Sequence, residues 1–303
     1  MELDWLEDFL ALSATLNFSR AAEARNVTQS AFSRRIRNLE LWVGARLIDR
    51  SVYPAALTPA GASFRAAAAE LVRGLAEARA EAQGRVSGGG PVIAFAALHT
   101  LALSFFPAWI RDLEAQLGPL KTRMAATNVH DCIDALVAGA CDLMLCYSHP
   151  IVPTAVDTSR YPSLRLARDR VLPVCAPGAD GRPLYDLGAA DGGPLPYLCY
   201  TPDSFLGRVV EVIAVREGLG PRLAFRYENS MSEALKAAAL ERQGLAWMPE
   251  SAIRREIAEG RLVAAGGPEF VMEMDIRLYR AIEHDNREVQ RLWASAQQGL
   301  ERR

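Results

Sequence analysis

The stretch of residues 17–50 constrains the fold more than any other part of the chain, because it reads as two short helices joined by a tight turn. Apolar residues recur at helical spacing and would bury one side of the pair: Ala21, Ala22, Val27, Phe32, Ile36 and Leu39. The other side of the second helix is polar, with Thr28, Gln29, Ser30, Ser33, Arg34 and Arg37. The pattern predicts a helix-turn-helix whose second helix can enter the major groove of DNA.

The charge of the chain is unevenly distributed, although the net charge is only −2. Residues 20–50 hold seven arginines against three acidic residues, whereas residues 1–16 hold four acidic residues and no basic one. Arginine can grip guanine with two hydrogen bonds and glutamine can do so with adenine, so a local basic face suits DNA contact. The alternative is that the arginines only solvate an exposed helix. It stays open for Arg35, which lies about 100° around the helix from Arg34.

Length and composition limit the class of protein. A chain of 303 residues predicts about two or three domains. The longest apolar runs, such as residues 101–110, are too short to span a bilayer, and the acidic N-terminus is no signal peptide, so we expect a cytoplasmic protein without membrane contact. The five cysteines show no metal-ligand spacing and should be reduced thiols. Catalytic triad, P-loop and dinucleotide motifs are missing, which predicts no enzyme activity, metal or cofactor.

Three parts can be separated along the chain. Residues 1–57 would be helical and end in a loop able to form a small β-wing, and residues 58–90 would be a long helix and a hinge. From residue 91 to 303, short apolar strands alternate with amphipathic helices, which predicts an α/β domain of two parallel sheets with a cleft between them. We expect lobe I at residues 91–167 and 268–303, and lobe II at residues 168–267.

The long helix after Thr58 and Pro59 has the spacing of a coiled-coil seam. Apolar residues recur at alternating steps of four and three, namely Phe64, Ala68, Leu71, Leu75 and Ala78. The pattern predicts dimerisation through this helix. The alternative is a helix that packs on its own domain.

The runs FLALSATLNFSRAAEARNVTQSAFSRRIRNLE, GARLIDR and LTPAG, within residues 9–61, resemble the N-terminal module of the LysR-type transcriptional regulators. The resemblance covers essentially the whole chain. It implies a winged helix-turn-helix, a dimerisation helix and a two-lobed effector domain similar to periplasmic binding proteins. It also implies a homodimer or homotetramer on promoter DNA with an approximate inverted repeat. Thr28 would cap the recognition helix, Arg50 would lie beside a phosphate, and DNA contacts would come from Gln29, Ser30, Ser33, Arg34 and Arg37.

In this family an effector lies between the lobes, at strand ends and helix starts. The matching positions here imply an effector site made of His99, Thr100, Asn128, Tyr147, Tyr200, Thr201, Ser230 and Met231. Hydroxyls near helix N-termini would suit a small anion. The alternative is that each hydroxyl only caps a helix. Among the other histidines, His149 also lies near a strand end, and His130 and His284 look solvent-facing.

The C-terminal half is similar to the hypochlorite-responsive branch of the family, in runs such as AALHTLALSFFP, ENSMSEALKAAAL and GLAWMPESAIRREIAEGRLV. Such regulators are thought to respond through methionine oxidation, which makes an apolar thioether polar. Met231, at a helix start facing the expected cleft, is the candidate here. Leu206 occupies a cleft segment where a methionine would have helped this interpretation, and Cys199 is a weaker oxidant candidate. A solute-binding protein and an enzyme using the cleft are the competing hypotheses.

Overall fold

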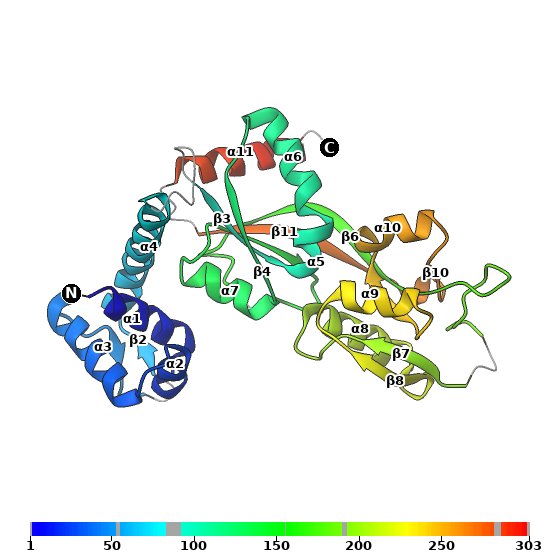
Figure 1. Ribbon diagram of the computed structural model, residues 1–303, viewed down its shortest axis with the longest axis horizontal. Coiled ribbons are helices and arrows are strands. Elements are labelled where there is room, and N and C mark those ends of the chain that lie inside the picture. The colour runs from blue at the N-terminus through cyan, green and yellow to red at the C-terminus, as the bar shows by residue number, and fades with distance from the viewer. Residues whose placement is uncertain are drawn as a thin grey trace. The chain divides into compact units, whose positions relative to one another are not determined.

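The computed structural model describes residues 2–52, 55–82, 92–154, 156–189, 193–281 and 286–301 (Figure 1). The chain forms two compact units. The N-terminal unit holds residues 1–91 and 134–142, and the C-terminal unit holds residues 92–133 and 143–303. In the described part of the chain, no helix is both long and apolar enough to cross a membrane.

The N-terminal unit contains a helix-turn-helix. Its elements are α1 (Leu3–Thr15), α2 (Phe18–Ala24), α3 (Gln29–Val43), β1 (Ile48–Asp49), β2 (Ala56–Leu57) and α4 (Pro59–Ala82). Asn17 caps α2 by accepting hydrogen bonds from two backbone amides, and Gly44 ends α3 in the left-handed conformation. The apolar residues predicted from helical spacing form the core: Ala21, Ala22, Phe32, Ile36 and Leu39 are fully buried, and Val27 packs against them.

The wing and the start of α4 approach each other closely. The strands β1 and β2 pair antiparallel, with Ile48 opposite Leu57. Thr58 caps α4 as expected, because its hydroxyl accepts the Gly61 amide at 3.0 Å. A Cβ atom on Gly61 would lie 2.0 Å from the Leu47 carbonyl oxygen, so only glycine lets the helix start against the wing.

The seam expected along α4 is divided between two environments. Phe64 and Ala68 pack into the core of their own unit, where the Phe64 ring lies 5.6 Å from that of Phe9. These two side chains therefore have partners within their own unit, and a seam between two copies at these positions stays a prediction. Leu71 and Leu75 remain about half exposed, at 55% and 54%. Ala78 lies outside the side chains that the structure describes.

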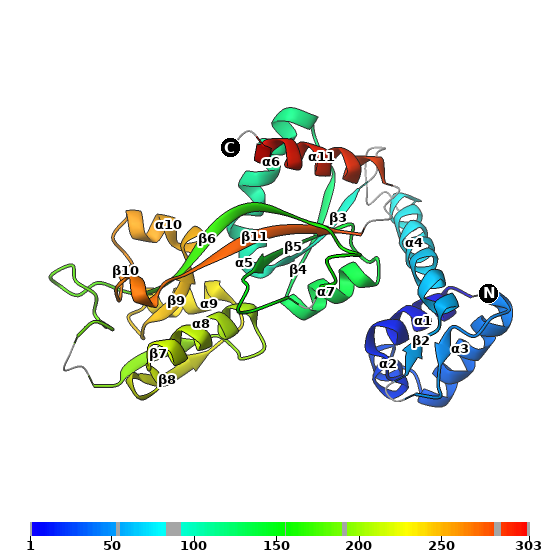
Figure 2. The same cartoon turned by 180° about the vertical axis from the view of Figure 1, so that it is seen from behind.

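The C-terminal unit is a mixed α/β domain (Figure 2). Its strands are β3 (Ile93–Leu98), β4 (Thr122–Thr127), β5 (Leu143–Ser148), β6 (Ser163–Cys175), β7 (Leu195–Cys199), β8 (Leu223–Glu228), β9 (Ala246–Pro249), β10 (Val263–Ala264) and β11 (Met272–Arg280). Its helices are α5 (His99–Ser104), α6 (Phe106–Leu117), α8 (Phe205–Arg216), α9 (Ser232–Leu240), α10 (Glu250–Ala258) and α11 (Arg287–Glu301), and two 3-10 turns lie at Gly220–Arg222 and Pro268–Phe270. The helix α7 (Val129–Val137) begins in this unit, and its residues from Asp134 onward belong to the N-terminal unit.

The sheets differ from the two parallel sheets that we expected. One seven-stranded sheet has the order β10-β6-β11-β5-β3-β4, with β9 also paired to β6, and β7 and β8 form a separate parallel pair. In the large sheet, β3 pairs parallel with β4 and β5, whereas β11 pairs antiparallel with β5 and β6, and β9 and β10 pair antiparallel with β6. Figure 1 shows that these two strands run from the side of α6 and α11 toward α8, α9 and α10.

Two further features have local causes. Residues 99–117 form two helices that meet at Phe105, before Pro107, because proline cannot donate its backbone amide within a continuous helix. The first half of β6 places exposed arginines between buried or half-buried residues, as in a strand with one face toward solvent.

Candidate functional site

The N-terminal turn of α3 presents the polar residues that the sequence placed there. Thr28 is the N-cap, as expected, and its hydroxyl accepts the Ala31 amide at 3.3 Å. Gln29 and Ser30 are exposed and Ser33 is half-buried. On the opposite side of the helix, Phe32, Ile36 and Leu39 fix the helix to the core. The start of α3 is therefore held rigidly while its polar side chains remain accessible.

Neighbouring arginines on α3 differ in whether they have an acidic partner within the N-terminal unit. Arg35 lies 3.3 Å from the carboxylate of Asp8, which is completely buried, and 3.5 Å from that of Asp4. Arg25 donates a second hydrogen bond to Asp8, at 2.9 Å. Arg34 and Arg37 are exposed and form no ion pair with any residue that the structure describes. Arg35 is therefore a structural partner of α1, whereas Arg34 and Arg37 are available for an external anion.

Arg50 follows the wing strand β1 and has a partner that the sequence did not reveal. Its guanidinium lies 2.7 Å from a carboxylate oxygen of Glu40 and 5.4 Å from the ring centre of Phe18. The other oxygen of Glu40 accepts the amides of Leu47 and Ile48, at 3.0 and 3.1 Å. Glu40 thus connects α3 to the wing by hydrogen bonds and partly neutralises the charge of Arg50.

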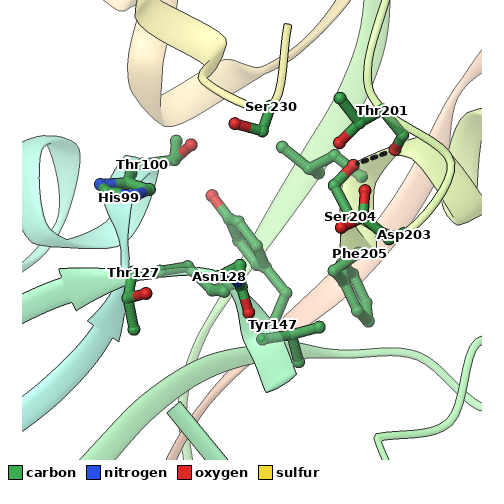
Figure 3. A pocket seen from close by; sticks show the side chains of 13 residues that line it. His99, Thr100, Thr127, Asn128, Tyr147, Thr201, Asp203, Ser204, Phe205 and Ser230 are labelled. Carbon is green, nitrogen blue, oxygen red and sulfur yellow. Dashed lines mark hydrogen bonds between the residues drawn. The ribbon is translucent and has the colours of Figure 1, made fainter. Parts of the chain in front are cut away.

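A pocket of about 260 Å³ lies at the ends of β3, β4, β5 and β7 (Figure 3). Six of the eight predicted effector residues line it: His99, Thr100, Asn128, Tyr147, Thr201 and Ser230. The other lining residues are Leu98, Thr127, Val129, Asp203, Ser204, Phe205 and Leu206. Thr127, Asp203 and Ser204 lie in segments expected near the cleft but were not among the predicted effector residues. A signal was available for Ser204, which is an N-cap between a strand and a helix and whose hydroxyl accepts the Gly207 amide at 2.9 Å.

Tyr200 and Met231, the other two predicted effector residues, are not among the residues that line this pocket. Tyr200 is buried, and its hydroxyl lies 2.8 Å from that of Ser232, which lies 2.8 Å from that of Thr100. Burial raises the pKa of Tyr200, so the phenol stays protonated and serves this internal chain of hydroxyls. Met231 precedes α9 with 38% of its surface exposed, outside the pocket wall.

Tyr147 connects the pocket to a buried carboxylate. Its hydroxyl donates to Asp169 at 2.9 Å, and the Ser251 hydroxyl donates to the same oxygen at 2.6 Å. Burial, followed by the charge of Asp169, raises the pKa of Tyr147 well above its ordinary value. The Tyr147 ring stacks on Phe205 at 6.0 Å. Tyr147 therefore contributes a neutral phenol to the pocket wall, held in place by its hydrogen bond to Asp169 and by its contact with Phe205.

The pocket is polar but carries little charge. Its lining holds seven hydroxyl or amide side chains, one carboxylate, Asp203, and no arginine or lysine. The cysteines are all buried and free, and burial raises the pKa of Cys199, which disfavours the reactive thiolate. Among the described residues, no group of histidine, cysteine and acidic side chains could hold a metal ion. The arrangement suits reversible binding of a small molecule by hydrogen bonds.

Comparison with known proteins identifies both parts. Residues 3–62 match the bacterial regulatory helix-turn-helix of the lysR family, and residues 87–301 match the LysR substrate binding domain. The chain belongs to the LysR family. It is a LysR-type transcriptional regulator with a DNA-binding helix-turn-helix and an effector-binding domain, and the fold class expected from the sequence is confirmed. The family consists of transcriptional regulators, so the solute-binding and enzyme hypotheses lose their support.

Several relatives of this LysR-type regulator cover nearly its whole length. The HTH-type transcriptional regulator YjiE of Escherichia coli (strain K12) is 34% identical over 296 residues, covering 97% of this chain and 93% of YjiE. DarR of Vibrio fischeri, solved in complex with DNA, is 34% identical, with 98% of each chain covered and a TM-score of 0.61. HypT from Salmonella typhimurium, described as a hypochlorite-specific LysR-type regulator, is 33% identical, with 99% and 98% covered and a TM-score of 0.62.

Proposed function

We propose that this regulator binds an approximate inverted repeat in promoter DNA as a homodimer or homotetramer, and reads each half-site with α3. The single observation that carries the proposal is that the arginines of α3 differ in their partners. Arg35 is bound to Asp8, whereas Arg34 and Arg37 are exposed and unpaired within the described residues. Gln29, Ser30 and Ser33 supply the other base or phosphate contacts, with Thr28 at the helix start, and Arg50 supplies a wing contact to phosphate. The proposed division of the chain is a DNA-binding domain at residues 1–57, a dimerisation helix and hinge at residues 58–90, and an effector-binding domain at residues 91–303.

The test is a DNA-binding titration at several salt concentrations, using promoter DNA from near the protein's own gene. Arg34→Ala should weaken specific binding by about 1–3 kcal/mol and relax sequence choice if Arg34 reads a base. Arg255→Gln is the matched control. It also removes one arginine charge, but Arg255 lies in the C-terminal unit, where it forms an exposed ion pair with Glu259. Equal affinities of Arg34→Ala and wild type would remove Arg34 from the interface.

Oligomer formation has support from α4. Leu71 and Leu75 are exposed leucines four residues apart on one helix, and each is about half exposed, so burying the exposed part against a second copy would stabilise the oligomer by about 1 kcal/mol for each side chain. Leu71→Glu with Leu75→Glu should therefore dissociate the oligomer. Analytical ultracentrifugation measures the result, and an unchanged mass at micromolar concentration would contradict this part of the proposal.

The pocket at Thr100 and Tyr147 is the proposed effector site. Hydroxyl and amide groups converge there, and no guanidinium is available to balance a strongly charged ligand, so we propose a small effector that is uncharged or singly charged. Ser230→Phe would fill the pocket from an exposed position. This variant should keep promoter affinity and lose the transcriptional response. A full response from Ser230→Phe would place the effector elsewhere.

Control by an oxidant is a second candidate. It is favoured by the similarity to HypT, which is described as hypochlorite-specific, and by the partly exposed thioether of Met231. Leu206 in the pocket wall and the raised pKa of Cys199 weigh against oxidation within the pocket itself. Promoter transcription with and without hypochlorite should lose its difference in Met231→Leu, and Met124→Leu is the control. Equal responses of both variants and wild type would exclude Met231.

A further inference from the structure

The polar groups around the effector pocket differ in what they can still offer a ligand. A hydroxyl donates one hydrogen bond and can accept two, so its partners within the protein decide which of these remain. Figure 3 shows His99 and Thr100 on one side of the pocket and Thr201 and Asp203 on the other, with the Tyr147 ring between them in this view. The hydrogen bonds that such side chains already make therefore indicate the chemistry of the effector.

Three of the lining hydroxyls donate their protons to the protein. The Tyr147 hydroxyl donates to Asp169 at 2.9 Å, and the Thr127 hydroxyl donates to Asp131 at 2.8 Å. The Ser204 hydroxyl donates to a backbone carbonyl at 2.8 Å. Because each proton is engaged, the three oxygens can only accept a hydrogen bond from a ligand.

The helix starts at the pocket add few donors. At the start of α7, the side-chain oxygen of Asn128 accepts the Asp131 amide at 3.0 Å. At the start of α8, the Ser204 hydroxyl accepts the Gly207 amide at 2.9 Å. The start of α5, at His99, has no side-chain cap, but this helix has only six residues and therefore few aligned peptide dipoles. An anion, which can only accept hydrogen bonds, would find few free donors here.

Carboxylates lie in the pocket wall and directly behind it. Asp203 lines the pocket itself, whereas Asp131 and Asp169 hold the hydroxyls of two lining residues. Within the described ranges, none of these three carboxylates forms an ion pair, and no lysine or arginine lines the pocket. The charge around the pocket therefore favours a positively charged ligand over a negatively charged one.

We infer that the effector is a small primary amine that carries hydroxyl groups and no carboxylate, as an amino alcohol or an amino sugar does. This inference rests on the proposed function of the pocket as the effector site. The ammonium group, which is a donor only, pairs with the carboxylate of Asp203 and donates to acceptor oxygens such as that of Ser204. The hydroxyl groups of the ligand meet Thr201, Ser230 and His99, which can each donate or accept and have no other partner in the described part of the chain.

The test is calorimetric titration of the full-length protein with ethanolamine and glucosamine. The matched neutral probes are ethylene glycol and glucose, and the matched anions are glycolate and gluconate. At least one amine should bind saturably, with a Kd on the order of 1 mM. It should bind at least about tenfold more tightly than its neutral and anionic counterparts, because only the amine pairs with Asp203.

Three variants locate the binding. Asp203→Asn preserves the size of the side chain and removes its charge, so it should weaken binding of the amine by about tenfold or more. Asp180→Asn is the matched control, since it removes one exposed carboxylate from the same unit and Asp180 does not line the pocket. It should bind the amine like the wild type. Ser230→Phe, which fills the pocket, should abolish binding.

The outcomes separate this inference from the proposed function of the pocket. Saturable binding of glycolate or gluconate in place of the amines, with loss of binding in Ser230→Phe, would overturn the inference and leave the pocket as the effector site. Amine binding that persists in Ser230→Phe would overturn both. Wild-type affinity for the amine in Asp203→Asn, or absence of saturable binding by both amines, would also overturn the inference.

Discussion

Replacing two adjacent arginines should separate DNA reading from domain stability. Arg35→Ala removes an interaction at 3.3 Å with the buried carboxylate of Asp8, whereas Arg34→Ala removes no partner in the described part of the chain. A hydrogen bond to a charged group contributes about 1.5–3 kcal/mol. The lower end applies here, because Arg35 is 29% exposed and Arg25 still neutralises Asp8. We therefore expect Arg35→Ala to destabilise the helix-turn-helix by about 1.5 kcal/mol.

Hydrogen exchange of the α1 and α3 amides in the full-length protein measures this loss locally, without assuming a single unfolding transition for two units. A loss of about 1.5 kcal/mol corresponds to roughly tenfold faster exchange. DNA affinity, measured where Arg35→Ala is still folded, should stay close to wild type. Arg34→Ala should show the reverse, with unchanged exchange and weakened binding. The reasoning fails if Arg35→Ala exchanges like wild type, or if it weakens specific binding as much as Arg34→Ala.

Three further perturbations test other parts of the structure. Glu40→Gln removes the ion pair with Arg50 and should speed amide exchange in the wing by several-fold, with little change in α4; unchanged exchange would show that the pair is negligible. Gly61→Ala should lower the melting temperature of the helix-turn-helix by several degrees, because its Cβ would collide with a backbone carbonyl, and an unchanged melting temperature would refute that packing. The raised pKa of Tyr200 and Tyr147 gives stability that is fully present below the unfolded value of about 10 and is lost as pH rises above it, since the unfolded chain deprotonates first. Tyr200→Phe should flatten this decline in thermal unfolding of the effector domain, and an equally steep decline would exclude Tyr200 as its cause.

Local sequence patterns were sufficient for the recognition helix. The cap at Thr28, the apolar spacing through Phe32 and Ile36, and the left-handed Gly44 all act within a few residues, so they can be read from the chain. The pairing of Arg35 with Asp8 joins residues 27 positions apart and has no local signal. For the same reason, heptad spacing along α4 could not reveal that Phe64 packs on its own domain.

The position of the pocket in the fold could be predicted from the sequence, but not every residue that lines it. The resemblance to the LysR family implied Thr100, Asn128 and Tyr147, and their place agrees with the rule that ligands bind at the carboxyl ends of parallel strands. It does not say which way a side chain points. Consecutive residues of an extended chain face opposite sides, so Thr201 lines the pocket while Tyr200 turns into the buried hydroxyl chain. Only the tertiary structure decides between such neighbours.

The long strands β6 and β11 determine how the effector domain can deform. They pair continuously along much of their length, with a register shift between Ile276 and Arg277, where a bulge adds twist. The second half of β6 also pairs with β9 and β10, so both halves of this strand are held by backbone hydrogen bonds to neighbouring strands. A sharp bend within β6 would break several of these bonds. Any deformation along β6 is therefore spread over many paired residues and is not concentrated at one loop residue.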